Sequence, residues 1–323
     1  MPFKKYLSIL IKIVIVFFSF YFIYSELIHH NDVSRISLDS LLNTIVNNYS
    51  LILIVILMMF INWILESLKW KFMIRKIEEI SFITSLRAIF SGITVSSFTP
   101  NRIGEYGGRV FCLEKSDRIQ AVFITILCSM AQLLTTIIFG SFAFIILHEQ
   151  FLDDQYFIIE ISNFSLLVLS GLNILFVLAY FNVAYLIKVL LKFSFFNFLR
   201  QYINVISLFN TRDLLVTFLY SVFRYLVFSI QFLILLYVFS VDISFYDAVL
   251  SIMLVFFFIT LTPTITIAEI GVRGSMSLLV FMKFSSNVIG ILSSTFLLWI
   301  INLIIPAIIG SFFIFSLKFF RKS

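Results

Sequence analysis

The sequence predicts an all-α protein, a polytopic transmembrane helical bundle. Two observations support this prediction. Of the 323 residues, 61% are hydrophobic and only 12% are charged, and 42 are phenylalanine. A chain this apolar cannot bury its hydrophobic side chains inside a water-soluble globule of its own size. Apolar runs of roughly 20 residues also recur along the whole chain, and each is long enough as a helix to cross a hydrocarbon core of about 30 Å. We therefore expect a single transmembrane domain over residues 1–323, with no soluble catalytic domain.

The charges and cysteines exclude several other classes of protein. The net charge is +6, but the basic residues flank apolar runs, where they orient helices and meet anionic headgroups, so nucleic acid is not an expected partner. Cys112 and Cys128 have no metal-ligand spacing, and the histidines lie near predicted span ends. We expect no disulfide framework, no metal site and no cofactor.

Six apolar runs are predicted to cross the membrane completely: 6–28, 49–68, 119–147, 161–183, 214–240 and 288–316. The first run is too long for a signal-peptide core and lacks a small-x-small cleavage site, so we interpret it as a retained span. Two further apolar stretches, 81–98 and 247–262, each end at Thr-Pro.

Basic residues of the short connections predict the orientation, because Lys and Arg concentrate in cytoplasmic loops. One side carries Lys4, Lys5, Lys69, Lys71, Arg75, Lys76, Lys188, Lys192, Arg200, Arg212, Lys318, Arg321 and Lys322. The opposite connections carry Asp32, Asp39, Glu149, Asp153, Asp154, Glu160, Asp242 and Asp247, with Arg35 as the main basic exception. Both termini are therefore predicted to be cytoplasmic.

The two Thr-Pro stretches leave two topologies open. With six crossings, the charge pattern requires each stretch to enter the membrane and leave by the same side, as a re-entrant hairpin. If each stretch is instead a full span paired with the segment after it, the sidedness is unchanged. The sequence does not decide between these alternatives.

A motif occurs twice. Residues 99–109 are TPNRIGEYGGR and residues 262–273 are TPTITIAEIGVR, so each has Thr-Pro, a short spacer and Glu-x-Gly-x-Arg. The copies are about 164 residues apart, and segment 49–147 matches segment 214–316. The charge pattern makes the first copy enter from the cytoplasmic side and the second from outside. This is an inverted-topology repeat with halves at about 1–148 and 161–316, the signature of alternating-access transporters.

The uncharged motif residues are predicted to break the helices. Proline removes a backbone donor and disfavours helix at the preceding residue, while glycine permits the turn and lets helices approach closely. Broken backbone at membrane depth is tolerated only where it is buried in protein or faces a wet cavity. The residues assigned to this role are Thr99, Pro100, Gly104, Gly107, Gly108, Thr262, Pro263 and Gly271.

The charged motif residues are the candidate substrate-binding site. Glu105 and Arg109, like Glu269 and Arg273, are four residues apart and are expected to form ion pairs on one helix face. A charge at membrane depth costs roughly 2.5–3.5 kcal/mol, so such residues usually pair or face a polar pathway. Each pair is interpreted either as a structural clasp or as an arginine that binds an anionic headgroup, and the two are compatible if the pair opens for substrate.

Other polar residues receive weaker assignments. Arg102, within the first motif, joins the candidate substrate-binding residues. Arg224, in the middle of a span, is expected to snorkel, to pair with Glu269 or to line the pathway. Glu66 is interpreted, with Asn62, as an interhelical hydrogen-bonding residue. The basic and aromatic cluster at 69–76 is predicted to lie on the cytoplasmic leaflet as an anchor.

With both motifs in view, the chain resembles the lysylphosphatidylglycerol synthase transmembrane-region family, also called flippase-like membrane proteins. The likeness rests on TPNRIGEYGGR at 99–109 and TPTITIAEIGVRGS at 262–275. It implies a polytopic domain of a prokaryotic inner membrane whose best-known members move aminoacylated phospholipid between leaflets. Those members carry a C-terminal aminoacyl transferase domain. Because this sequence ends at Ser323 after its last span, we do not expect the synthase activity, and the substrate stays open between aminoacylated phospholipid and other lipid-linked molecules.

We therefore expect a lipid translocator rather than an enzyme. An anionic or zwitterionic lipid headgroup would enter between the repeats, where Arg109 and Arg273 contact its phosphate and Glu105 and Glu269 hold the arginines. One alternative is a membrane-embedded transferase acting on a lipid-linked donor. Another is a non-catalytic partner of an envelope-lipid synthase, and a homo-oligomer is also compatible with the sequence.

Overall fold

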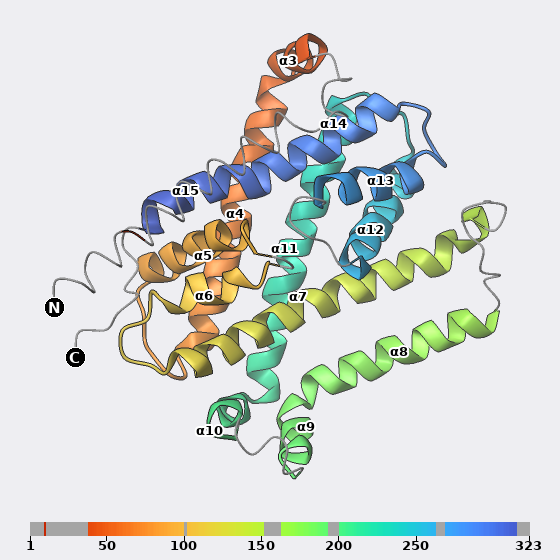
Figure 1. The fold of residues 1–323 in the computed structure, drawn as a ribbon. Helices are drawn as coiled ribbons and strands as arrows, with labels where there is room; N and C mark the ends of the chain where they lie inside the picture. Colours follow the sequence, from red (N-terminus) through yellow and green to blue (C-terminus); the bar gives the residue numbers. More distant parts are fainter. Residues whose placement is uncertain are drawn as a thin grey trace. The chain divides into compact units, whose positions relative to one another are not determined.

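The computed structural model describes residue 10 and residues 38–99, 102–151, 163–192, 200–262 and 269–314. Within these ranges the chain forms helices and no strand, which confirms the all-α prediction (Figure 1). The first predicted span, apart from Leu10, and the two motif prolines, Pro100 and Pro263, lie outside the described residues.

Four helical runs are long and apolar enough to cross a membrane: Tyr49–Ile74, Arg118–Gln150, Thr211–Val238 and Val288–Ile314. The first is α4, and the third is α11. The second consists of α7 (Arg118–Leu147) and the start of the 3-10 turn η2 (His148–Phe151). The fourth consists of α14 (Val288–Trp299), the π-helical η6 (Ile300–Ile304) and α15 (Ile305–Ile314). These helices make the protein a multi-pass integral membrane protein.

The fourth predicted span is bent. Helix α8 (Asn163–Phe181) covers most of it, and the chain then turns by 83° into α9 (Val183–Leu190). Asn182 leaves the helical conformation at φ −109°, and its side chain donates a 2.9 Å hydrogen bond to the carbonyl of Leu178. The described residues therefore hold four spans, or up to five if this bent pair is one span, and the first of the six predicted spans lies outside them.

The remaining helices are short. They are α3 (Leu38–Asn47), α5 (Phe82–Ser96), α6 (Gly104–Val110), α10 (Arg200–Ile203), the 3-10 helix η4 (Asn204–Leu208), α12 (Phe245–Leu261) and α13 (Glu269–Phe281). Pro306 lies just after the π-helical turn of the last run. Because proline has no backbone N–H, the ordinary helical ladder is interrupted there, and a wider turn accommodates it.

The chain divides into two compact units. The first contains the described residues up to Ile126, Glu269 and Ile270, and the helix from Phe296 onward. The second contains the described residues from Leu127 to Thr262 and Gly271–Thr295. Each unit therefore draws helices from both of the predicted repeat halves.

In the first unit, α15 packs closely on α5. The hydroxyl group of Thr94 donates a 2.9 Å hydrogen bond to the carbonyl of Ala307. A Cβ added to Gly310 would lie 2.1 Å from the carbonyl oxygen of Phe90 and 2.3 Å from the Thr94 hydroxyl. Only glycine allows this approach, so the last helix of the second half is fitted to the Thr-Pro helix of the first.

In the second unit, α7 packs on α12 in the same way. A Cβ added to Gly140 would lie 2.2 Å from the Cβ of Phe257. Gly140 and Gly310 stand equally far from the starts of their runs, Arg118 and Val288, while Phe257 and Thr94 stand equally far before the motif threonines. The last helix of the first half thus contacts the Thr-Pro helix of the second at the matching position, while the repeat itself stays a prediction.

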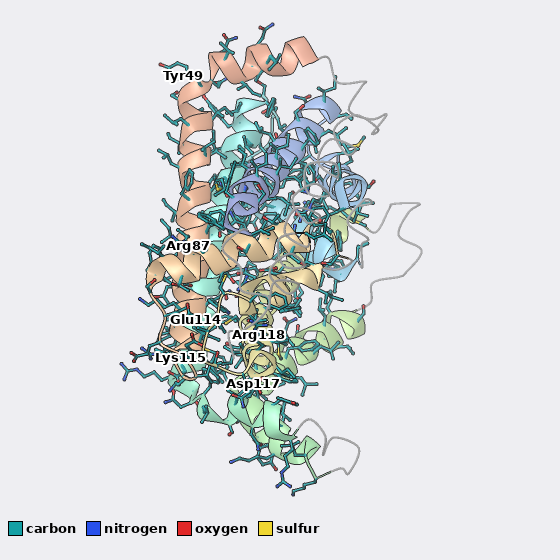
Figure 2. The ribbon with its side chains drawn as sticks, turned by 60° about the vertical axis from the view of Figure 1, so that its left-hand side comes forward. Tyr49, Arg87, Glu114, Lys115, Asp117 and Arg118 are labelled. Carbon is teal, nitrogen blue, oxygen red and sulfur yellow. The ribbon has the colours of Figure 1, made fainter. Side chains whose placement is uncertain are left out.

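A carboxylate joins two connections of the first unit. Glu78, between α4 and α5, accepts hydrogen bonds from the backbone N–H groups of Glu114, Lys115 and Ser116, at 3.0, 3.0 and 2.7 Å. Glu114 and Lys115 lie toward the end of α4 that is remote from Tyr49 (Figure 2). Partial burial opposes ionisation of Glu78, but these hydrogen bonds outweigh it and lower the pKa of the carboxyl group.

We predict that Gly140→Ala and Gly310→Ala each lower the stability by about 1–3 kcal/mol, because each added methyl group overpacks a helix contact. Gly171→Ala on α8 is the matched control, since a Cβ there meets nothing within 4 Å and alanine favours helix by up to about 1 kcal/mol. Thermal unfolding in detergent micelles measures all three. Equal effects at the three positions would contradict the close packing.

We also predict that Glu78 makes stability depend on acidity. Its folded pKa is lowered, so its contribution is fully present above the unfolded pKa and is lost as the pH falls through the folded pKa. Glu78→Gln should therefore reduce stability at neutral pH and flatten the acid limb of a plot of unfolding temperature against pH. Glu114→Gln, at an exposed position, serves as the control. An unchanged acid limb in Glu78→Gln would argue against a stabilising role for the three hydrogen bonds that Glu78 accepts.

Candidate functional site

The first motif builds a helical hairpin. Helices α5 and α6 lie side by side (Figure 1) and have 15 and 7 residues. At about 1.5 Å per residue they extend roughly 22 and 10 Å, both shorter than a hydrocarbon core of about 30 Å. These lengths favour the re-entrant hairpin over the alternative in which the stretch and its following segment are both full spans.

The hairpin turn depends on Thr99 and Gly104. The Thr99 hydroxyl accepts a 2.7 Å hydrogen bond from the backbone N–H of Gly104, at the start of α6. A Cβ on Gly104 would lie 2.7 Å from both this hydroxyl and the carbonyl of Val95. Arg102 adopts a φ of 57°, a left-handed conformation that costs a non-glycine residue of order 1 kcal/mol or more. The turn is thus held tightly and places Arg102 at its tip.

Two glycines bring the arms of the hairpin together. A Cβ on Gly108 would lie 2.6 Å from the Cα of Gly92 on α5. By contrast, a Cβ on the neighbouring Gly107 meets only the ring of Phe111, at 3.8 Å. Gly108 therefore sets the distance between α5 and α6. This close approach buries Arg109, the next residue, in the interior of the first unit.

Arg109 lies at the centre of a chain of ion pairs. One guanidinium nitrogen, Nη1, donates to Oε1 of Glu66 on α4 at 2.8 Å, and the other, Nη2, donates to Glu105 on its own helix. The second oxygen of Glu66 pairs with Nζ of Lys69 at 2.7 Å. The predicted pair of Glu105 and Arg109 is thus present, and α4 supplies two further charges.

These charges differ in how deeply they are buried. The side chains of Lys69, Arg109 and Glu66 are 1%, 2% and 4% exposed. The side chain of Glu105 is 24% exposed. Burial of a charge is tolerated only when it is paired, so Glu66 is the fixed partner of Arg109, whereas Glu105 is the partner that is accessible from the surface of the protein.

The tip of the hairpin carries a second ion pair. Nη2 of Arg102 donates to Oε1 of Glu269 at 2.9 Å, which joins the first motif to the first residue of α13. The Arg102 side chain is 38% exposed, and it also interacts electrostatically with Glu105. We call these six side chains the charged cluster: Glu66, Lys69, Arg102, Glu105, Arg109 and Glu269. It contains three cationic and three anionic groups and is therefore electrically balanced.

The prediction of a surface anchor at 69–76 is wrong for its first half. Helix α4 continues without a break to Ile74, and Lys69 and Trp70 are buried. The indole of Trp70 donates a 3.0 Å hydrogen bond to the hydroxyl of Thr125. Glu66 forms an interhelical hydrogen bond, as expected, with Arg109 as the donor. Its ion pair with Lys69 was missed, although a spacing of three residues is a signal for an ion pair on one helix face.

The other predicted residues are found in the second unit. Nη1 of Arg224 donates to the amide oxygen of Gln132 at 3.3 Å, and its guanidinium lies 6.0 Å from the ring centroid of Phe228. The hydroxyl of Thr262 donates to the carbonyl of Phe258 at 2.8 Å, at the end of α12. Arg273 and Gly271 lie on α13, where a Cβ on Gly271 would meet nothing within 4 Å. The pairing of Glu269 with Arg273 stays a prediction.

Comparison with known protein families shows to which family the chain belongs. The family model described as "Lysylphosphatidylglycerol synthase TM region" matches residues 9–310. The chain belongs to this family. The match confirms the resemblance inferred from the two motifs. No curated protein matches the chain. The charged cluster is thus carried by an integral membrane member of the lysylphosphatidylglycerol synthase TM region family.

We predict that the two carboxylates bound to Arg109 differ in their effect on stability. Glu66→Gln leaves buried Lys69 and Arg109 with too little negative charge and should cost about 3–5 kcal/mol. Glu105→Gln should cost clearly less, because Glu105 is partly exposed and Arg109 keeps its buried partner Glu66. Thermal unfolding of the two variants in the same detergent tests this order, and a larger loss for Glu105→Gln would reverse our assignment of the fixed and the accessible partner.

Proposed function

We propose that this protein moves a phosphate-bearing lipid headgroup between the leaflets of a bilayer. The observation that carries the proposal is the buried guanidinium of Arg109, which a short broken-helix hairpin presents between one fixed and one accessible carboxylate. Ionisable groups inside membrane proteins mark substrate pathways, and discontinuous helices mark substrate sites in transporters with inverted repeats. Membership of the family supports the same function.

The geometry supports an exchange of partners. A phosphate can replace the carboxylate of Glu105 on Nη2 of Arg109, because both are anions that a guanidinium binds through directed N–H groups. Glu66 would keep its bond to Nη1, so the guanidinium would stay in place. The acyl tails would remain in the surrounding lipid while the headgroup crosses.

Other motif residues have roles in this proposal. Arg102 at the tip of the hairpin would attract the headgroup, and Glu269 would hold Arg102 until the headgroup arrives. Arg273 and Arg224 would provide phosphate contacts in the second repeat. The proposal places the protein in a prokaryotic inner membrane with both termini in the cytoplasm, as the basic connections predict.

The test uses purified protein in phosphatidylcholine vesicles that contain acyl-labelled phosphatidylglycerol or phosphatidylethanolamine. Chemical quenching of the outer leaflet measures the exchange rate. We expect the native protein to accelerate exchange of at least one labelled lipid. Arg109→Lys should slow this exchange about tenfold or more, since lysine keeps the positive charge but lacks the planar pair of N–H groups with which a guanidinium binds phosphate. Arg212→Lys, at an exposed position in the first turn of α11, is the matched control. If vesicles with the native protein exchange the labelled lipids no faster than protein-free vesicles do, the proposal is overturned.

A further inference from the structure

Glu66 and Lys69 form an ion pair behind Arg109 that neither repeated motif contains. Both lie on α4, three residues apart, and both are almost completely buried. Glu66 contacts Lys69 through one oxygen and Arg109 through the other, at 2.7 and 2.8 Å. Lys69 therefore acts on Arg109 through Glu66.

We propose that Glu66 and Lys69 are positioning residues that set how strongly Arg109 binds an anionic headgroup; this inference rests on the proposed function. Glu66 fixes Nη1 of Arg109 and leaves Nη2 on the side where Glu105 is accessible. Lys69 neutralises Glu66, so that Arg109 keeps a full positive charge available for the group that faces Nη2. A phosphate that replaces Glu105 leaves Glu66, Lys69, Arg109 and the phosphate electrically balanced.

The balance predicts opposite effects for the two single variants. Lys69→Met leaves Glu66 without its second cation, so the buried site becomes more negative and repels an anionic headgroup. Glu66→Gln removes a negative charge, so the site becomes more positive and attracts it. The double variant Glu66→Gln/Lys69→Met restores the balance. A buried charge at a separation of a few ångströms changes binding by about tenfold or more.

A purely structural role predicts a different pattern. If the pair only holds α4 and α6 together, each single variant should reduce the maximal rate for phosphatidylglycerol and phosphatidylcholine alike, and Glu66→Gln should not lower the apparent KM for phosphatidylglycerol. Lys69→Arg keeps the charge and should behave like the native protein under our proposal. Lys71→Met makes the same change two residues later, outside the charged cluster, and serves as the matched control.

The experiment measures leaflet exchange of acyl-labelled phosphatidylglycerol against its mole fraction in phosphatidylcholine vesicles. It gives an apparent KM and a maximal rate for each variant. We expect Lys69→Met to raise the apparent KM about tenfold, Glu66→Gln to lower it, and the double variant and Lys69→Arg to return it to near the native value. Labelled phosphatidylcholine, which is net neutral, should show much smaller changes in KM.

Two outcomes separate the inference from the proposed function. If the native protein exchanges phosphatidylglycerol but Lys69→Met leaves the apparent KM for it unchanged, or alters phosphatidylcholine equally, the pair is structural and the inference is overturned while the function stands. If the native protein exchanges neither labelled phosphatidylglycerol nor labelled phosphatidylethanolamine, the proposed function fails and the inference fails with it. Should Glu66→Gln not fold, the apparent KM values of Lys69→Met and Lys69→Arg for phosphatidylglycerol and phosphatidylcholine give the same decision.

Discussion

The candidate site depends on one constraint, which is that a charge surrounded by apolar helices must have a partner of opposite sign. Arg109 satisfies it twice, through Glu66 and Glu105, and Glu66 satisfies it again through Lys69. The partners are not equivalent, because the side chain of Glu105 is 24% exposed and that of Glu66 only 4%. This difference converts a stabilising ion pair into one that a competing anion can open from one side.

Close packing by glycine makes the site possible. Gly108 lets α6 lie against α5 at Gly92, and Gly104 lets the chain turn around the Thr99 hydroxyl. Elsewhere, Gly310 and Gly140 fit the last helix of each predicted half onto the Thr-Pro helix of the other half at a matched register. Because α15 packs on α5, the hairpin of the first motif depends on a helix near the end of the described chain and is not an independent addition to the bundle.

The sequence predicts much of this arrangement because the physics involved is local. Apolar runs predict the spans, Thr-Pro predicts the ends of α5 and α12, and the spacing of four residues predicts the pair of Glu105 and Arg109. The contacts of Arg102 with Glu269 and of Arg109 with Glu66 join residues far apart in the chain, so local spacing carries no signal for them. The burial of Lys69 was missed for a related reason. A basic residue near a predicted span end is usually interfacial, and only the fold shows that α4 continues past it.

The most direct test of the central claim is an experimental structure of the protein with phosphatidylglycerol bound in a lipid nanodisc. We predict a headgroup phosphate about 3 Å from Nη2 of Arg109, with Glu105 turned away and the contacts of Glu66 with Lys69 and Arg109 intact. A lipid-bound structure in which Arg109 still pairs with Glu105, and the phosphate lies elsewhere, would contradict the account.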